Sequence, residues 1–496
     1  MRSAFLSAFL AGALLALPAA AQETPAPPRE GILSLLPGNA SSEHTITLGG
    51  ETLRYRAEAG TLDLLGGDAK PTAAVFHTAY TLETGENGAQ RPITFVFNGG
   101  PGAASAYLHL GAIGPRVVAT AEDGAFLPPP QRMVDNPDTW LPFTDLVFVD
   151  PVGTGWSRAA PGTEEKSFWG VSQDASAMGA FIRLFLQKSG RTGSPLYLAG
   201  ESYGGFRAAL LAKTLQEDIG IAPSGIVLIS PALELSMVFG RDWGPLRPAL
   251  ELPPMVASRL AREGVTGDAF AKGVAEAEAY AMGPYMAALA QGREAGGRLA
   301  SARVAELTGL PRDLVERHFA RVPTRVFARE AARATGEVLS MYDGGLGAPD
   351  PQPQSAWGGG PDSVLDRSVP VLTSAFVDYA ARELGFRTPV SFRLLNGAVS
   401  GAWDYGFAEG RQGYAGVMDD LQEARALNPA LRVLITHGFT DLVTPYTTSR
   451  FLVDQLPPLE GAEPIGLRTY PGGHMMYLRA DARAALTRDV REVYGE

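Results

Sequence analysis

The stretch LYLAGESYGG at residues 196–205 limits the possible folds of this chain more than any other segment. Its apolar first half predicts a buried strand, and the amphipathic pattern of residues 206–215 predicts a helix directly after it. Ser202 lies at the turn between them, with a glycine two residues before it and another two residues after it. In this G-x-S-x-G arrangement, small neighbours permit a strained turn that lifts the serine hydroxyl clear of a sheet. Ordinary glycine-rich turns also match the pattern, so a nucleophilic serine needs chemical partners elsewhere in the chain.

Several other apolar segments predict strands that end in Gly- or Pro-rich turns, at residues 93–97, 146–150, 225–230, 431–436 and 466–470. Alternating segments that precede them predict an antiparallel set, at residues 44–48, 53–57 and 73–81. Helical patterns at residues 167–188, 445–456 and 481–494 separate or follow the apolar strands. Such an alternation favours an α/β fold with a mostly parallel central sheet and helices on both faces. Reactive groups are then expected where the strands end, at their carboxyl edge.

Residues 241–389 differ in composition and apolar pattern from the rest of the chain. Ala- and Arg-rich helical runs at 268–290 and 312–332 have no predicted strands between them. We interpret this region as a helical insertion that caps a main domain made of residues 41–240 and 390–496. A separate helical domain is the alternative, and periodicity does not decide between the two.

The first 21 residues have the pattern of a signal peptide. Arg2 supplies the positive start, residues 4–17 are mostly apolar, and a small-x-small pattern ends at Ala21, where cleavage is expected. The alternative is an uncleaved membrane anchor, for which the apolar run is short. Residues 22–40 read as a linker. The sequence therefore predicts an exported protein, periplasmic or secreted, with no membrane anchor after cleavage.

Composition excludes several classes of function. A net charge of −11 argues against a nucleic-acid partner, because phosphate binding needs basic patches. The absence of cysteine excludes a thiol nucleophile and thiolate metal sites. No metal-ligand spacing and no phosphate-binding loop stand out, so no metal and no cofactor are expected. The sequence leaves the oligomeric state open.

A serine nucleophile needs an imidazole as its base and a carboxylate that orients the imidazole. In sheets with this kind of turn the chain order is Ser, acid, His. Of the six histidines, His437 and His474 follow Ser202 in loops after predicted strands. His474 is the predicted base, because only it leaves a strand-end acid, Asp441, between itself and the serine. His437 is the alternative base, and Asp404 is the rival acid.

Acyl transfer also needs donors for the oxyanion. The amide of Tyr203, directly after the nucleophile, is one candidate. A second is expected from the glycine-rich loop after residues 93–97, where Gly99 and Gly100 follow Asn98. The alternative for this loop is a tight turn with no role in binding.

Five blocks in this order resemble the serine carboxypeptidases, a family with the α/β-hydrolase fold: residues 98–102, 150–157, 200–205, 438–441 and 473–475. The resemblance suggests an exported member of bacterial type that releases single C-terminal amino acids from peptides through an acyl-enzyme. It implies roles for residues in three groups: the catalytic Ser202, Asp441 and His474; the oxyanion-binding amides of Gly100 and Tyr203; and the substrate-carboxylate site of Asn98, Gly99 and Glu201.

One departure from the family pattern concerns this carboxylate site. Glu201 can lie beside a substrate carboxylate only if one of the two acids is protonated, which predicts faster turnover in acid than at neutral pH. The family usually has a second glutamate that partners it, where this chain has Ala112.

Two other classes of function stay open: an esterase or acyltransferase with the same three catalytic residues, and a secreted binding protein that kept the fold without catalysis.

Overall fold

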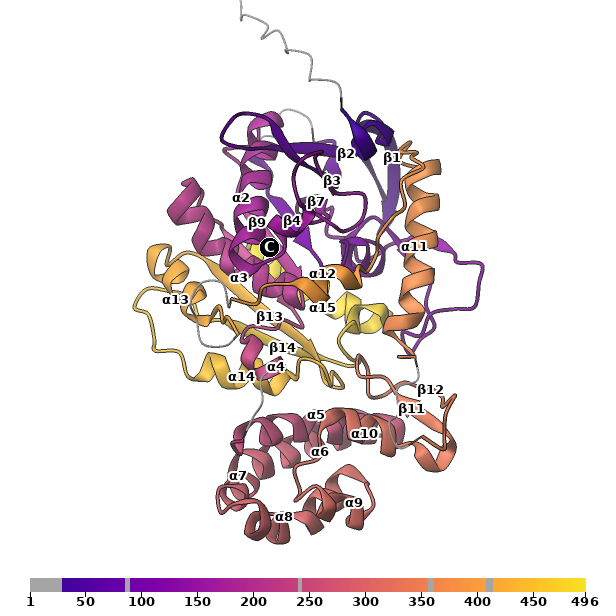
Figure 1. The fold of residues 1–496 in the computed structure, drawn as a ribbon, viewed down its shortest axis with the longest axis vertical. Helices are drawn as coiled ribbons and strands as arrows, with labels where there is room; N and C mark the ends of the chain where they lie inside the picture. The colour runs from indigo at the N-terminus through magenta and orange to yellow at the C-terminus, as the bar shows by residue number, and fades with distance from the viewer. Residues whose placement is uncertain (1–28, 85–89, 240–242, 356–360, 407–413) are drawn as a thin grey trace, which may run out of the picture.

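A computed structural model describes residues 29–84, 90–239, 243–355, 361–406 and 414–496 (Figure 1). The predicted signal peptide lies outside these residues. One ten-stranded sheet crosses the main body in the order β1-β2-β3-β7-β4-β9-β10-β13-β14, with β8 beside β3. Its strands are β1 (Ala40–Leu48), β2 (Glu51–Leu65), β3 (Pro71–Leu82), β4 (Ile93–Phe97), β7 (Asp145–Val149), β8 (Arg158–Ala159), β9 (Leu196–Glu201), β10 (Gly225–Ile229), β13 (Arg432–Gly438) and β14 (Gly466–Tyr470).

The sheet is antiparallel at one edge and parallel through the rest. The pairs that join β1, β2, β3 and β7 are antiparallel. Every pair from β7 through β4, β9, β10 and β13 to β14 is parallel. The predicted mostly parallel sheet, with an antiparallel set before it, is confirmed.

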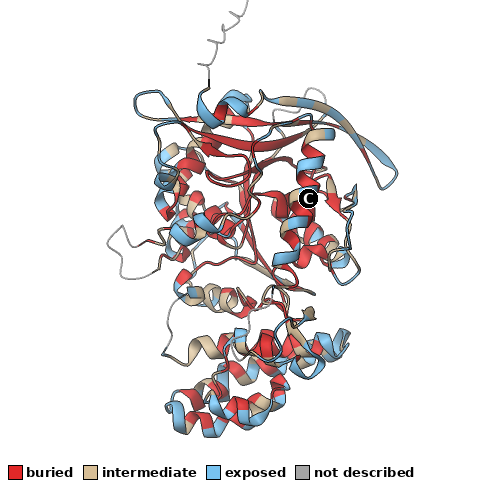
Figure 2. Ribbon diagram, turned by 45° about the vertical axis from the view of Figure 1, so that its right-hand side comes forward, coloured by how far each residue is buried: buried red, intermediate tan, exposed pale blue. Residues whose placement is uncertain are grey.

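Helices cover both faces of the sheet because its central strands are apolar on both sides. Successive side chains of a strand point to opposite faces, so Phe95 and Val96 belong to two separate apolar cores. One core contains side chains of α2 (Val171–Lys188), α3 (Tyr203–Thr214) and α13 (Met418–Leu427). The other contains side chains of α11 (Leu365–Arg382) and α15 (Ala480–Tyr494). Figure 2 shows buried residues along the sheet and on the inward faces of these helices.

A second group of helices lies beyond one end of the body, at the bottom of Figure 1. It contains α5 (Leu246–Arg262), α6 (Gly267–Tyr280), α7 (Met286–Leu289), α8 (Arg293–Thr308), α9 (Arg312–Arg317) and α10 (Thr324–Glu330), followed by β11 (Glu337–Leu339) and β12 (Gly347–Pro349). We call α5 to β12 the helical insertion. It has its own apolar core, to which the body adds Leu442 and Tyr446, the latter at the start of α14 (Tyr446–Asp454).

The structure differs from the sequence predictions in three places. The helix expected over residues 312–332 is broken into α9 and α10, since Phe319 and Ala320 between them have φ 53° and 60°, which a right-handed helix does not allow. α11 lies in the sequence range predicted for the cap, yet its Phe376 packs in the core of the body. In the predicted linker, Leu33 and Leu36 are buried against that same core.

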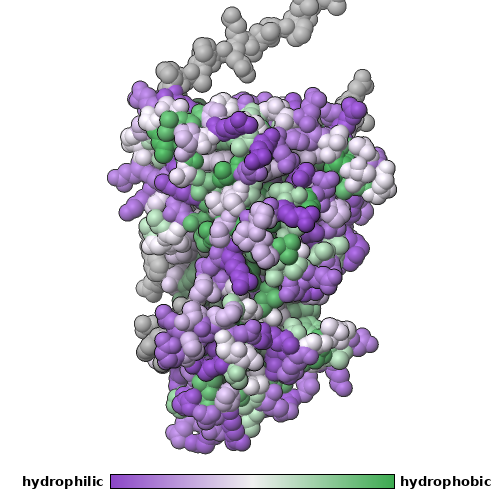
Figure 3. All heavy atoms as spheres, turned by 90° about the vertical axis from the view of Figure 1, so that its right-hand side faces the viewer, coloured by the Kyte–Doolittle hydropathy of each residue, from purple (hydrophilic) through white to green (hydrophobic). Residues whose placement is uncertain are grey.

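The outer surface offers no extended apolar face in the view of Figure 3, where hydrophilic side chains surround small apolar groups. Among the helices that the structure describes, none combines the length and apolarity that crossing a bilayer requires.

Candidate active site

Ser202 lies at a strained turn between β9 and α3, as its motif predicts. Its backbone has φ 58° and ψ −122°, a conformation that is costly for a residue with a side chain. Gly200 and Gly204 must be glycines because a side chain at either position would collide with the backbone. A Cβ on Gly200 would lie 1.9 Å from the carbonyl oxygen of Gly204, and a Cβ on Gly204 would lie 2.5 Å from that of Phe97. The bond from the Ser202 amide to the Ile229 carbonyl, 2.9 Å long, ties the turn to β10.

His474 and Asp441 come together from two different loops of the body. The Nδ1 atom of His474 lies 2.7 Å from Oδ2 of Asp441, and both side chains are buried. The amides of Val443 and Thr444 donate to the other carboxylate oxygen, Oδ1, at 2.8 and 3.0 Å. Because a carboxylate can only accept, Nδ1 carries the proton and Nε2 is left with a lone pair. Burial lowers the pKa of His474, but the charge and hydrogen bond of Asp441 outweigh it and leave the pKa above its usual value.

Ser202 and His474 line one cavity of about 130 Å³. The same cavity is lined by Asn98, Gly99 and Gly100 from the loop after β4, and by Glu201 and Tyr203 on either side of the serine. Every residue of the predicted site except Asp441 therefore borders this cavity, and Asp441 contacts it through His474. We call it the serine cavity.

The alternative base and the rival acid lie elsewhere. His437 is fully buried in β13, where its Nε2 atom bonds the Ser449 hydroxyl at 2.8 Å. Burial lowers its pKa to about 4, so it stays neutral. The carboxylate of Asp404 accepts from the amide of Gly406. Neither residue lines the serine cavity.

Two backbone amides at the serine cavity are suited to bind an oxyanion. The amide of Tyr203 is the first of α3, where the helix leaves its N–H groups unpaired. The Gly100 backbone has φ +99°, which favours glycine. Within the described part of the chain, neither amide donates to a protein acceptor. Both donors are therefore available to a ligand in the cavity, at the positive end of a helix.

Glu201 is a buried acid with neutral hydrogen-bonding partners. The Asn98 carboxamide donates to Oε2, and the hydroxyl of Tyr477 lies 2.9 Å from both carboxyl oxygens. Burial raises the pKa of Glu201 to about 7, even though His474, Tyr477 and Asn98 each act to lower it. At acid pH the group is thus a neutral carboxyl that can donate a hydrogen bond.

Sequence reasoning missed Tyr477 as a member of this cluster. It lies in the short helical turn Met476–Leu478, three residues after His474, and its side chain is fully buried. Ala112, at the position where the family usually has a glutamate, is buried and carries no acid. The nearness of Tyr477 to the predicted base was the one available signal in the sequence.

A second missed residue, Asp343, joins the loops of the acid and the base. Its Oδ1 atom accepts from the Thr440 hydroxyl at 2.6 Å, and its Oδ2 atom accepts from the Gly473 amide at 3.0 Å. The backbone carbonyl of its neighbour Tyr342 accepts a hydrogen bond from the backbone amide of His474 at 2.5 Å. The segment that carries both residues lies between β11 and β12 of the helical insertion. The sequence analysis assigned these two residues only to the predicted insertion, and nothing in their local pattern indicates these distant contacts.

The loop that carries Asn98 is also held in place by a side chain of α3. Arg207 of α3 donates to the Asn98 carbonyl at 2.8 Å and pairs with Asp174 at 2.6 Å, with both charged groups buried.

Among the described residues, no group of three or more His, Asp or Glu side chains is arranged to hold a metal ion.

Comparison with known proteins identifies relatives of one kind. The family model for serine carboxypeptidase matches residues 56–222. Serine carboxypeptidase-like 44 of Arabidopsis thaliana is 32% identical over 169 residues, which are 33% of this chain and 32% of that protein. The pheromone-processing carboxypeptidase KEX1 of Yarrowia lipolytica is 33% identical over 143 residues, which are 28% of this chain and 21% of that protein. The matched segments thus span about a third or less of these relatives. They come from a plant and a fungus, so the expected bacterial type stays a prediction.

A solved structure extends the likeness in fold over most of the chain. The prohormone-processing carboxypeptidase Kex1(delta)p from Saccharomyces cerevisiae has a TM-score of 0.54 at 15% identity, covering 89% of this chain and 91% of that chain. The family match includes Asn98, Glu201 and Ser202, whereas Asp441 and His474 lie outside it. Residues 56–222 thus resemble the serine carboxypeptidase family, and the chain as a whole has the α/β-hydrolase fold.

Proposed function

We propose that this protein is a serine carboxypeptidase that releases single amino acids from the C-terminus of peptides. The observation that carries the proposal is the position of Glu201. This buried acid, bonded to Asn98 and Tyr477, borders the same small cavity as Ser202 and His474. A reactive serine alone suits any acyl donor, but a neutral carboxyl group beside it suits a substrate that ends in a free carboxylate.

The first half of the proposed reaction forms an acyl-enzyme. The Ser202 hydroxyl attacks the carbonyl carbon of the last peptide bond while Nε2 of His474 takes its proton. Asp441 holds the imidazole by its Nδ1 proton and stabilises the positive charge that forms. The amides of Gly100 and Tyr203 donate to the oxyanion of the tetrahedral intermediate. As the C–N bond breaks, His474 returns the proton to the departing amine.

The second half uses the same groups with water as the nucleophile. His474 takes a proton from the water, the new oxyanion binds the same two amides, and the bond from the carbonyl carbon to the Ser202 oxygen breaks as the proton returns to that oxygen. During the first half, before the amino acid leaves, Asn98, Glu201 and the amide of Gly99 bind the C-terminal carboxylate of the peptide. Peptides are the proposed substrates, and the chemistry needs neither a metal nor a cofactor.

The domain assignment and export are part of this proposal. Residues 41–240 and 390–496, together with α11, would form the catalytic domain, with a cap inserted between them. The separate core of α5 to α10 supports such a cap, and the packing of α11 in the body supports an end of the cap near β12. The pattern of residues 1–21 supports cleavage and export to the periplasm or outside the cell.

Mass spectrometry of an N-blocked peptide mixture tests the activity. We expect the wild type to remove single C-terminal residues, and Ser202→Ala to lose this activity by a factor on the order of 10⁵ while keeping its fold. Each peptide is paired with its C-terminal amide and its methyl ester. Hydrolysis of the methyl ester with little cleavage of the free peptide would favour an esterase or acyltransferase. No cleavage and no labelling of Ser202 by an organophosphonate would favour a binding protein.

A further inference from the structure

A second, larger cavity opens beside the serine cavity. Its volume is about 920 Å³, within the usual range for ligand sites, whereas the 130 Å³ of the serine cavity lies below that range. We call it the arginine cavity. Three residues line both cavities: Val238, Phe239 and Val443. A peptide held at Ser202 therefore needs more room than the serine cavity offers, and the neighbouring space lies across this shared wall.

The order of groups indicates which part of a peptide would enter. Asn98 and Glu201, proposed to hold the departing residue, line the serine cavity and not the arginine cavity. The departing residue thus lies away from the shared wall. The acyl part of the peptide, which precedes the scissile bond, would extend past Phe239 into the arginine cavity.

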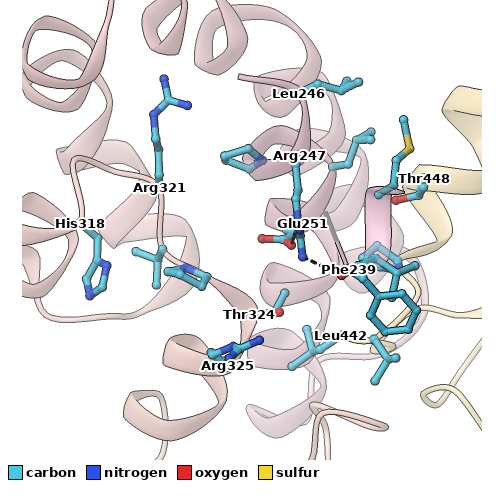
Figure 4. Close-up of a pocket in the computed structure, with 18 of the residues that line it drawn as sticks. Phe239, Leu246, Arg247, Glu251, His318, Arg321, Thr324, Arg325, Leu442 and Thr448 are labelled. Carbon is cyan, nitrogen blue, oxygen red and sulfur yellow. Dashed lines mark hydrogen bonds and ion pairs between the residues drawn. The ribbon is translucent and has the colours of Figure 1, made fainter. Parts of the chain in front are cut away.

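The wall of the arginine cavity carries an excess of positive charge. Among the described residues, this wall includes one acid, Glu251, and five arginines: Arg247, Arg293, Arg317, Arg321 and Arg325. Figure 4 shows Phe239 and Leu442 on one side of this space and His318 and Arg321 on the other. The whole chain has a net charge of −11, so this concentration of guanidinium groups runs against its average.

Two of the five arginines are neutralised by acids next to them. Arg247 pairs with Glu251, and Arg317 pairs with Asp313. No carboxylate in the described part of the chain forms an ion pair with Arg293, Arg321 or Arg325. Arg321 donates to the carbonyls of Gly244 and Leu289, which holds its position without cancelling its charge.

Aromatic surface is exposed at the same place. Phe239 and Phe319 both line the cavity and are 46% and 41% exposed. The guanidinium group of Arg293 lies over the exposed ring of Trp243, 5.5 Å from its centre. A ligand with both negative charge and apolar side chains would therefore be complemented along this wall.

We infer that the arginine cavity binds the part of the peptide before the scissile bond and selects acidic residues there. This inference rests on the proposed function and adds a substrate class to it. Guanidinium groups suit carboxylates because their donors match both oxygens.

Matched peptides test the selection. Three N-acetylated hexapeptides share one C-terminal dipeptide and carry Glu, Ser or Lys at the three preceding positions. We expect kcat/KM for the Glu peptide to exceed that for the Lys peptide about tenfold at low salt, because two or three partly exposed charge pairs add up to about that factor. The ratio should shrink as salt is added. Arg325→Glu should bring the ratio close to one, or reverse it.

Arg298→Glu is the control, since it changes the net charge equally within the same helical insertion. Arg298 is 68% exposed, pairs with Glu294 and lines neither cavity. The control should keep the wild-type ratio. Equal rates for the Glu and Lys peptides in the wild type, or equal loss of selectivity in both variants, would overturn the inference.

Binding separates this inference from the proposed function. Titration of Ser202→Ala with each peptide, followed by calorimetry, measures affinity without turnover. If the wild type hydrolyses no peptide, the proposed function fails. The cavity assignment would still be supported if the Glu peptide binds more tightly than the Lys peptide and Arg325→Glu abolishes this difference. Equal affinities for the Glu and Lys peptides would refute it.

Discussion

The serine cavity and the arginine cavity differ in how their polar groups are held. Around Ser202 the polar side chains are buried, close together and bonded to one another, as in the Asp441–His474 and Glu201–Tyr477 pairs. Around the arginine cavity they are charged and partly exposed, and several have no acidic partner among the described residues. Most residues of the predicted site in the first cavity lie in loops at the ends of sheet strands, whereas most residues that line the second cavity belong to the helical insertion.

This difference separates chemistry from selection. Proton transfer and oxyanion binding need groups held at fixed distances, which a buried and fully bonded cluster provides. Selection among peptides needs accessible charge, which exposed helices provide. The two parts are nonetheless joined, because Leu442 follows Asp441 and packs in the core of the insertion. The insertion also sends Asp343 back to the loops of Asp441 and His474.

The strongest test of this junction is removal of the Leu442 side chain. Leu442→Ala should lower the free energy of unfolding by about 3 kcal/mol, since the residue is 2% exposed and its loss leaves a cavity. Urea denaturation measures this. Leu299→Ala is the matched control, because Leu299 of α8 is 61% exposed and should cost less than about 0.5 kcal/mol. Equal midpoints for the two variants would mean that the insertion does not depend on Leu442.

Asp343→Asn tests whether the insertion positions the loops that carry Asp441 and His474. Asparagine keeps the shape of the side chain but replaces one acceptor oxygen with an NH₂ group. That group would face a hydrogen-bond donor, either the Gly473 amide or the Thr440 hydroxyl, so one of the two hydrogen bonds would be lost. We expect kcat to fall about ten- to a hundredfold with little change in KM, because the reacting groups shift while binding groups stay. Asp378→Asn, at an exposed acid on α11, should leave both constants unchanged. A change in KM alone would argue against positioning.

The pH dependence of kcat/KM tests the chemical state of Glu201. Because its pKa is raised to about 7, the carboxyl is protonated below that pH and can bond a substrate carboxylate. Above pH 7 it ionises and repels the carboxylate, so kcat/KM should fall about tenfold per pH unit. At the acid end the rate should fall as His474 is protonated. Glu201→Gln stays neutral and should lack the alkaline fall. If the variant retained the wild-type alkaline limb, another group would have to be responsible for it.

Much of the arrangement of residues around Ser202 could be predicted because its signals are local. The strand-turn-helix at Ser202 requires glycines on both sides, and this requirement is visible in ten consecutive residues. The order of Ser202, Asp441 and His474 along the chain, each after a predicted strand, then placed the three at one edge of a parallel sheet. Strand-end positions converge whatever the intervening sequence is, so distance along the chain did not obscure them.

The sequence by itself determined the sheet, the elbow and the identity of the residues at the strand ends, because repeating apolar patterns and tight glycine turns are short-range properties. Only the tertiary structure decided that α11 packs in the body, that Tyr477 bonds Glu201, and that Asp343 joins two loops. It also decided which arginines gather at one cavity. These arrangements depend on how separate elements pack, and no local pattern encodes the contact between residues that lie about a hundred positions apart, as Asp343 and Thr440 do.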